Sequence, residues 1–218
     1  MENTEDYGLF FEEEKVLCTS AGDLVPAFVE TPRRKYKYSV EYYKTGGVKS
    51  VYLNDIQRIM TPAGIFPAEY VTFYESGNLK RFFPTDGKLS GFWGEEDEKT
   101  MNVPISLEFS FAAFTAYLSG VYFYESGKIK SVTLYPNEFV DIMTSQGTIK
   151  TRVGFSLYED GKLRSLEPAL PTKITTKDGT FRAYDINANC VNADRNSLEF
   201  GADGGVISFV DIDKEENL

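Results

Sequence analysis

Apolar and polar positions alternate with a period of two along this chain, and a glycine repeatedly breaks the alternation. The pattern is clearest in residues 121–132 and 71–82, which share an aromatic-Tyr-Glu-Ser-Gly core. Looser copies surround Gly46, Gly161 and Gly204. Such alternation is typical of half-buried β-strands. Because glycine readily takes the positive φ of a tight turn, each copy predicts two antiparallel strands joined by a short turn.

A second turn pattern, Thr-x-x-Gly between apolar strands, alternates with the first. It occurs at residues 19–22, 61–64, 144–147 and 176–179, with a degenerate copy near 111–117. One continuous strand is expected from each such turn to the next Tyr-containing turn, as in 65–75 and 148–159. The return strands are interrupted at 53–55, 135–137 and 167–168. Proline removes a donor from the ladder, so these breaks predict bends, edges or bulges.

The two patterns predict an all-β protein, in which repeated antiparallel β-hairpins form a long meander as an open or coiled sheet. A five-bladed β-propeller is the alternative, since repeats of about 40 residues suit a blade. We expect one repeat-built domain over residues 1–218. Its units are 14–53, 54–93, 101–134, 138–166 and 172–209. We also expect three further elements: an extra hairpin at 83–93, an exposed acidic insertion at 94–100 and a charged tail at 211–218.

Composition narrows the chemistry. The 218 residues include 33 Asp and Glu, 23 Lys and Arg and no histidine, for a net charge of −10. The lack of histidine excludes His-dependent catalysis and His metal sites. The negative charge argues against binding to nucleic acid. Cys18 and Cys190 are predicted to be buried free thiols, with a disulfide as the alternative. No secretory signal or membrane-spanning run is recognised, so a cytoplasmic location is expected.

The tyrosine before each turn and the basic residue after it are expected on one outer face. A Lys or Arg over an aromatic ring contributes about 0.5–1 kcal/mol at an exposed site, which gives the pattern a structural reason to recur. The same exposed row is the candidate binding face, together with Trp93, the only tryptophan. No catalytic residue, metal or cofactor is predicted. The candidate tyrosines and their basic neighbours are Tyr43, Tyr74, Tyr124 and Tyr158, with Lys49, Lys80, Lys130 and Arg164.

The Tyr-Glu-Ser-Gly-x-apolar-Lys-Ser stretches resemble the variant MORN repeats of bacterial proteins, including a family described as antitoxin-like. The resemblance covers residues 71–82, 121–132 and 155–166, and more loosely 40–51 and 198–209. This chain departs from the family in its irregular repeat spacing. It also has the Thr-x-x-Gly element where the family has a Gly-rich second strand.

The resemblance implies a hairpin array that serves as an interaction scaffold. The expected function is therefore non-catalytic binding of another protein in the bacterial cytoplasm, with an antitoxin or immunity role as one version. Neither nucleic-acid binding nor membrane insertion is expected. One alternative is a carbohydrate-binding or carbohydrate-acting β-protein that uses the tyrosines, Trp93 and acidic residues. Two carboxylates with raised pKa in a cleft beside exposed aromatics would favour it. The other alternative is a structural homo-oligomer that pairs through sheet edges.

Overall fold

The computed structural model describes residues 5–35, 37–188 and 193–215. Strand accounts for 52% of the structure and helix for 4%, which confirms the all-β prediction. The strands pair in an antiparallel meander that does not close. They are not grouped into four-stranded blades. The prediction of an open meander is therefore confirmed, and the propeller alternative is wrong. The chain divides into two compact units: unit 1 is Met1–Val103 with Gly120–Lys128, and unit 2 is Pro104–Ser119 with Ile129–Leu218.

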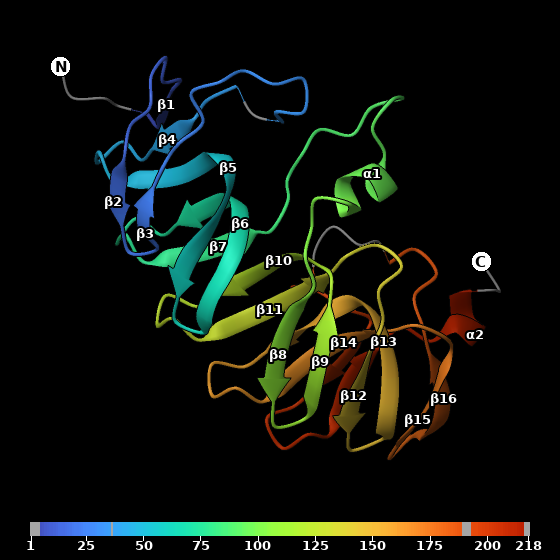
Figure 1. The fold of residues 1–218 in the computed structure, drawn as a ribbon. Helices are drawn as coiled ribbons and strands as arrows, with labels where there is room; N and C mark the ends of the chain where they lie inside the picture. Colours follow the sequence, from blue (N-terminus) through green and yellow to red (C-terminus); the bar gives the residue numbers. More distant parts are fainter. Residues whose placement is uncertain (1–4, 36, 189–192, 216–218) are drawn as a thin grey trace. The chain divides into compact units, whose positions relative to one another are not determined.

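The meander of unit 1 has the strand order β1-β4-β5-β6-β7-β10 (Figure 1). A separate hairpin, β2–β3, lies beside the far end of β5, where the Met60 N–H donates to the Ala21 carbonyl at 2.9 Å. The elements are β1 (Tyr7–Leu9), β2 (Leu17–Thr19), β3 (Gly22–Leu24), β4 (Val40–Tyr42), β5 (Val48–Thr61), β6 (Gly64–Phe73), β7 (Leu79–Phe83), α1 (Glu95–Lys99) and β10 (Leu118–Phe123).

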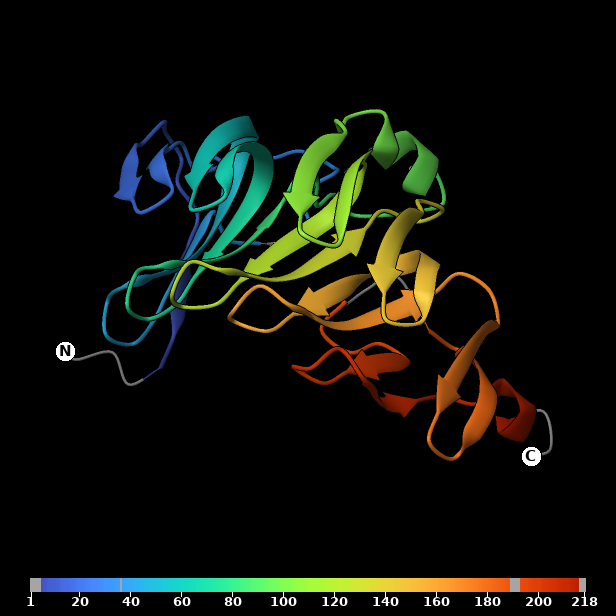
Figure 2. The ribbon, with the colours of Figure 1, turned by 90° about the horizontal axis from the view of Figure 1, so that it is seen from below.

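Unit 2 repeats this plan with the strand order β11-β13-β14-β17-β18, and β12 pairs with the first part of β13. Two further hairpins, β8–β9 and β15–β16, flank the β12–β13 turn (Figure 2). The elements are β8 (Ile105–Phe109), β9 (Ala112–Ala116), β11 (Ile129–Leu134), β12 (Val140–Thr144), β13 (Gly147–Leu157), β14 (Leu163–Pro168), β15 (Thr172–Thr176), β16 (Gly179–Ala183), β17 (Leu198–Phe200), β18 (Val206–Phe209) and α2 (Ile212–Glu215).

The Tyr-containing turns share one hydrogen-bonding pattern. In each turn the glycine N–H donates to the carbonyl three residues before it, and the N–H of that earlier residue donates to the carbonyl four residues after it. The turn glycines at 46, 77, 127, 161 and 204 have φ between 81° and 87°. That region strongly favours glycine, because it strains residues with a Cβ. The predicted hairpin turns are therefore confirmed.

Three tyrosine hydroxyls link their turns to the next strand. The acceptor in each case is the backbone carbonyl just before the following turn of the series, so neighbouring turns are held in register. The three bonds join Tyr43 to Phe73 at 2.8 Å, Tyr74 to Phe123 at 2.7 Å and Tyr158 to Phe200 at 2.8 Å.

The threonines of the second pattern cap their own turns. Thr19, Thr61 and Thr144 each donate a hydroxyl to the carbonyl of the turn glycine, at 2.8–2.9 Å. Each also accepts the backbone N–H two residues further on, at 3.0–3.1 Å. Short side chains that bond nearby backbone in this way stabilise turns. The hydroxyl groups that define both repeats are thus used in the framework.

The core of each unit is aromatic. In unit 1, Phe82 lies between Phe66 and Phe123, with ring centroids 5.5 and 6.2 Å apart. In unit 2, Phe155 receives three phenylalanines of the β8–β9 hairpin edge-on, at 5.4–5.9 Å. Edge-to-face packing is a favoured arrangement of buried rings. The β8–β9 hairpin therefore completes the core of its unit.

Three local predictions are wrong. Residues 84–94 form a loop with a single bridge between Ser90 and Trp93, where a hairpin was expected. The acidic run that follows forms α1, and Glu98 in it is buried because it bonds an arginine. Cys18 is exposed, because it pairs with Asp23 on the outer side of the β2–β3 hairpin. Cys190 lies outside the described residues, as do the last three positions of the tail, which otherwise begins with α2.

Removing a linking hydroxyl should weaken the sheet. We expect Tyr43→Phe to lower the free energy of unfolding by about 1 kcal/mol, the usual net value of one hydrogen bond. The adjacent Tyr42 is the matched control, since its hydroxyl bonds no residue that the structure describes. Tyr42→Phe should change stability by less than about 0.5 kcal/mol. Urea denaturation measures both, and equal losses would contradict the proposed role of the Tyr43 hydroxyl.

Candidate functional site

The four candidate tyrosines lie half-buried along the Tyr-turn edges of their units. Lys80 lies over the ring of Tyr74 at 5.4 Å, and Arg164 over that of Tyr158 at 5.9 Å, as the pattern predicts. The structure thus gives these residues a structural role. Their use as a binding face stays a prediction.

Trp93 is half-buried and belongs to a buried charge cluster in unit 1. Its indole Nε1 donates to Glu98 Oε2 at 2.6 Å. Arg33, from the loop before β4, lies between Glu98 and Glu69 of β6. We call Arg33, Glu69, Glu98 and Trp93 the Arg33 cluster.

The Arg33 guanidinium binds both carboxylates in a bidentate manner. Its Nη2 donates to Glu69 Oε2 at 2.7 Å and its Nε to Glu98 Oε2 at 2.9 Å. Further bonds join its two Nη atoms to the other oxygen of each carboxylate. Paired bonds of this kind fix geometry as well as charge. The N-terminal loop, the sheet and α1 therefore meet at one side chain.

Backbone groups complete the Arg33 cluster. The Asp86 N–H donates to Glu69 Oε2 at 2.7 Å, and the Gly87 N–H donates to Glu98 Oε1 at 2.8 Å. The Lys88 N–H donates to the Arg33 carbonyl at 2.8 Å. A Cβ on Gly87 would lie 2.5 Å from Glu98 Oε2, so only glycine fits there. We call residues 84–100 the insertion segment, and these bonds attach it to the sheet at several points.

The hydrogen bonds of the Arg33 cluster favour the charged form of Glu98. The side chains of Glu69 and Glu98 are only 6% and 5% exposed. Burial alone would raise the pKa of Glu98, but hydrogen bonds from Arg33, Trp93 and Gly87 hold it below its usual value. For Arg33, burial favours the neutral form, yet the bonds to Glu69 and Glu98 raise its pKa further. Because Arg33 keeps its proton, the Arg33 cluster is suited to fixing structure and poorly suited to proton transfer.

The insertion segment carries the most exposed large apolar residue among those that the structure describes. Phe92 is 100% exposed and Leu89 is 50% exposed. Glu95, Glu96 and Asp97 follow directly in the first turn of α1, and all three are exposed. A firmly attached segment therefore presents an aromatic ring to solvent beside acidic side chains.

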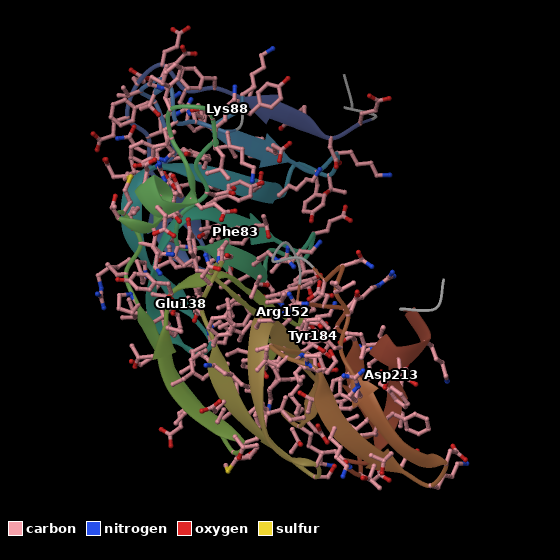
Figure 3. All side chains as sticks on the ribbon, turned by 90° about the vertical axis from the view of Figure 1, so that its right-hand side faces the viewer. Phe83, Lys88, Glu138, Arg152, Tyr184 and Asp213 are labelled. Carbon is pink, nitrogen blue, oxygen red and sulfur yellow. The ribbon has the colours of Figure 1, made fainter. Side chains whose placement is uncertain are left out.

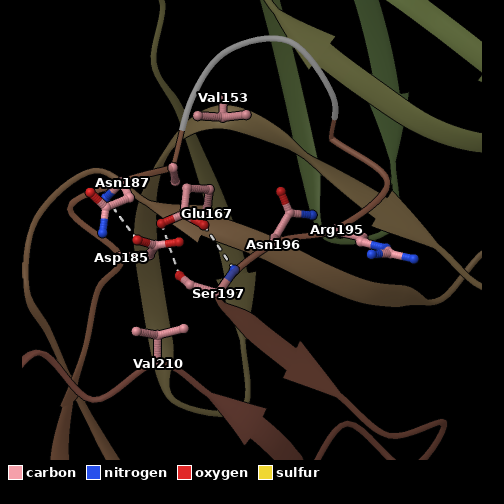
Figure 4. Close-up of a pocket in the computed structure, with 9 residues that line it drawn as sticks. Val153, Glu167, Asp185, Asn187, Arg195, Asn196, Ser197 and Val210 are labelled. Atoms are coloured by element: carbon pink, nitrogen blue, oxygen red, sulfur yellow. Dashed lines mark hydrogen bonds between the residues drawn. The ribbon is translucent and has the colours of Figure 1, made fainter. Parts of the chain in front are cut away.

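Unit 2 contains a polar cavity of about 300 Å³ (Figure 4). It is bordered by the end of β14 and by the loop between β16 and β17. Glu167, only 1% exposed, lies at its base and accepts the N–H and the hydroxyl of Ser197, both at 2.8 Å. Burial raises the pKa of Glu167, against the bonds from Ser197 and the charge of Arg152.

The surroundings of Glu167 are also structural. The Arg152 guanidinium donates to the carbonyls of Pro168 and Asp185 and lies over the Tyr184 ring at 4.7 Å (Figure 3). The second acid of the cavity, Asp185, accepts the Asn187 N–H at 2.7 Å. No aromatic side chain among the described residues lines this cavity. It therefore lacks the aromatic platform expected of a carbohydrate site.

Sequence reasoning assigns Trp93 to a binding face, which stays a prediction, and it misses the partners that Trp93 has in the Arg33 cluster. Arg33, Glu69 and Glu98 are far apart in the sequence, and single acids carry little information in a chain with 33 of them. Two local signals exist: an acidic residue five positions after the sole tryptophan, and the Asp86-Gly87 dipeptide, which often marks a turn or loop. Among the described residues, no group of three His, Cys, Asp or Glu side chains is arranged to hold a metal. The described helices are all too short or too polar to cross a membrane.

Comparisons with protein-family models, with curated protein sequences and with solved structures each give no match for this chain.

Acid should release the insertion segment. Because the folded-state pKa of Glu98 lies below its ordinary value of 4.5, its stabilising effect is complete above that pH and is lost as pH falls through the folded value. Trp93 fluorescence reports this directly, since it is the only tryptophan. We expect a transition with its midpoint below pH 4.5.

The matched variants are Glu98→Gln and Glu96→Gln, which change a buried and an exposed acid of the same helix. Glu98→Gln should shift Trp93 emission at pH 7 to that of a solvated indole and lower the free energy of unfolding by about 3 kcal/mol, as for a broken buried ion pair. Glu96→Gln should behave as the parent does. Identical acid profiles for the two variants would rule out this account of Glu98.

Proposed function

We propose that this protein is a non-catalytic, MORN-like interaction scaffold that binds another protein in the bacterial cytoplasm. An antitoxin or immunity role is one form of this proposal, and it rests on the family resemblance alone. The observation that carries the proposal is the use of the repeated hydroxyls. Those of Tyr43, Tyr74 and Tyr158 and of the capping threonines bond backbone, so the repeats form a framework.

The acidic residues support the same conclusion. Glu69 and Glu98 are both bonded to Arg33, and Glu167 holds Ser197 in place. Catalysis of glycoside hydrolysis needs two carboxylates across an open cleft, one of them a proton donor. The polar cavity of unit 2 has two acids, but Glu167, the one with the raised pKa, accepts two bonds from Ser197, and no aromatic residue among those described lines the cavity. A binding role therefore fits these side chains better than a hydrolytic one.

Exposed apolar side chains on fixed hairpins provide contact surface. Met60 and Ile65 face each other across the β5–β6 hairpin in unit 1 and are 56% and 55% exposed. Met143, on the β12–β13 hairpin of unit 2, is 58% exposed. Methionine adapts to irregular partner surfaces, which suits a binding protein. These hairpin tips are the surfaces that the scaffold proposal uses.

The test is affinity capture by the purified protein from cells of the organism that produces it. The parent is compared with a Met60→Ser/Ile65→Ser variant and a Met143→Ser variant, after thermal melting shows that all three fold alike. We expect one protein to co-purify with the parent through gel filtration and to bind at least one variant about tenfold more weakly. Turnover of a glycan panel, with no protein partner, would contradict the proposal.

A further inference from the structure

Phe92 is held in a fixed position although its ring is fully in solvent. The chain reverses at Ser90-Gly91-Phe92-Trp93, where the Ser90 N–H donates to the Trp93 carbonyl at 2.9 Å. The Phe92 N–H donates to the Ser90 hydroxyl at 3.2 Å. Trp93, the next residue, is bonded to Glu98 within the Arg33 cluster. The backbone that carries the Phe92 ring is thus fixed on both sides.

This arrangement is costly unless the ring is used. Full burial of a phenylalanine side chain stabilises a protein by about 1.5–3 kcal/mol. The exposed Phe92 ring contributes no such stabilisation. The two buried carboxylates, the partly buried Arg33 and the N–H groups of Asp86 and Gly87 instead order the loop. Ordering a contact segment in advance reduces the entropy that binding must remove. Aromatic residues, phenylalanine among them, are also enriched at protein interfaces.

The charged residues near Phe92 indicate what kind of surface it can bind. Glu95, Glu96 and Asp97 lie exposed three to five residues after it, while Lys88 and Lys99 are the basic residues of the same segment. The whole chain carries a net charge of −10. An acidic border favours partners with basic side chains and disfavours anionic membrane surfaces.

We propose that Phe92 is an anchor that inserts into an apolar pocket, bordered by Lys and Arg, on a partner protein. Leu89 extends the apolar contact, and Glu95 and Glu96 pair with the basic border. The Arg33 cluster keeps the segment in its binding conformation. This inference rests on the proposed scaffold function and assigns its central contact to the insertion segment.

The experiment places the photo-crosslinking residue benzoylphenylalanine at position 92 in the full chain, expressed in the cells that produce it. A second variant carries it at position 139, an exposed phenylalanine of unit 2. We expect position 92 to crosslink to one protein, at a site with apolar residues surrounded by Lys and Arg, and position 139 not to do so.

Binding of that purified protein then tests the energetics. We expect Phe92→Ala to raise the Kd about 30-fold, as for a binding hot spot, and Phe139→Ala to change it less than about twofold. Glu95→Gln/Glu96→Gln should weaken binding severalfold and flatten its dependence on salt. Unchanged Trp93 emission shows that the insertion segment of each variant keeps its conformation.

Other outcomes overturn the inference. Crosslinks from position 92 to a second copy of the chain or to lipid would show that the Phe92 ring contacts one of these and not a partner protein. A partner that binds the Phe92→Ala variant within twofold of the parent would leave the scaffold function intact and remove Phe92 from it. If the parent captures no protein at all, the scaffold function and this inference both fail.

Discussion

The position of one guanidinium group determines how unit 1 is assembled. Arg33 comes from an irregular loop, Glu69 from the sheet and Glu98 from a short helix, and each would be costly to bury alone. Together they form four charge-assisted bonds. The same two carboxylates receive the Asp86, Gly87 and Trp93 N–H groups. The irregular part of the unit therefore gains a defined structure without a hydrophobic core of its own.

The regular parts follow a related rule, in which polar side chains satisfy backbone groups where strands leave the sheet. Three tyrosine hydroxyls bond the strand beside their turn, and three threonine hydroxyls close turns of the second kind. Glu167 bonds Ser197 at the end of β14. Satisfied groups of this kind avoid the cost of buried, unpaired donors and acceptors. A framework that uses its polar groups internally leaves function to exposed side chains, and Phe92 is the most exposed large apolar residue in the part of the chain that the structure describes.

The fold was predictable because its signals are local. Alternation in 71–82 and a glycine at 77 specify two strands and a turn without reference to the rest of the chain. The Arg33 cluster was not, because its members interact across separations of 36 and 65 residues. The acidic run at 94–98 shows the limit clearly: its composition indicates a solvated loop, and only the distant arginine makes Glu98 a buried residue. The cysteine prediction failed for a different reason: Cys18 pairs with Asp23 within the local β2–β3 hairpin and lies exposed.

Hydrogen exchange of the Trp93 indole N–H tests the central claim most directly. The signal is unique in a proton–nitrogen NMR spectrum, because the chain has one tryptophan. If the Arg33 cluster holds the insertion segment, this N–H exchanges slowly in the parent protein, and Arg33→Met makes it exchange rapidly while the strand amides stay protected. Exchange in the parent as fast as in a free indole would show that the segment is not held, and the account of Phe92 as a fixed anchor would be wrong.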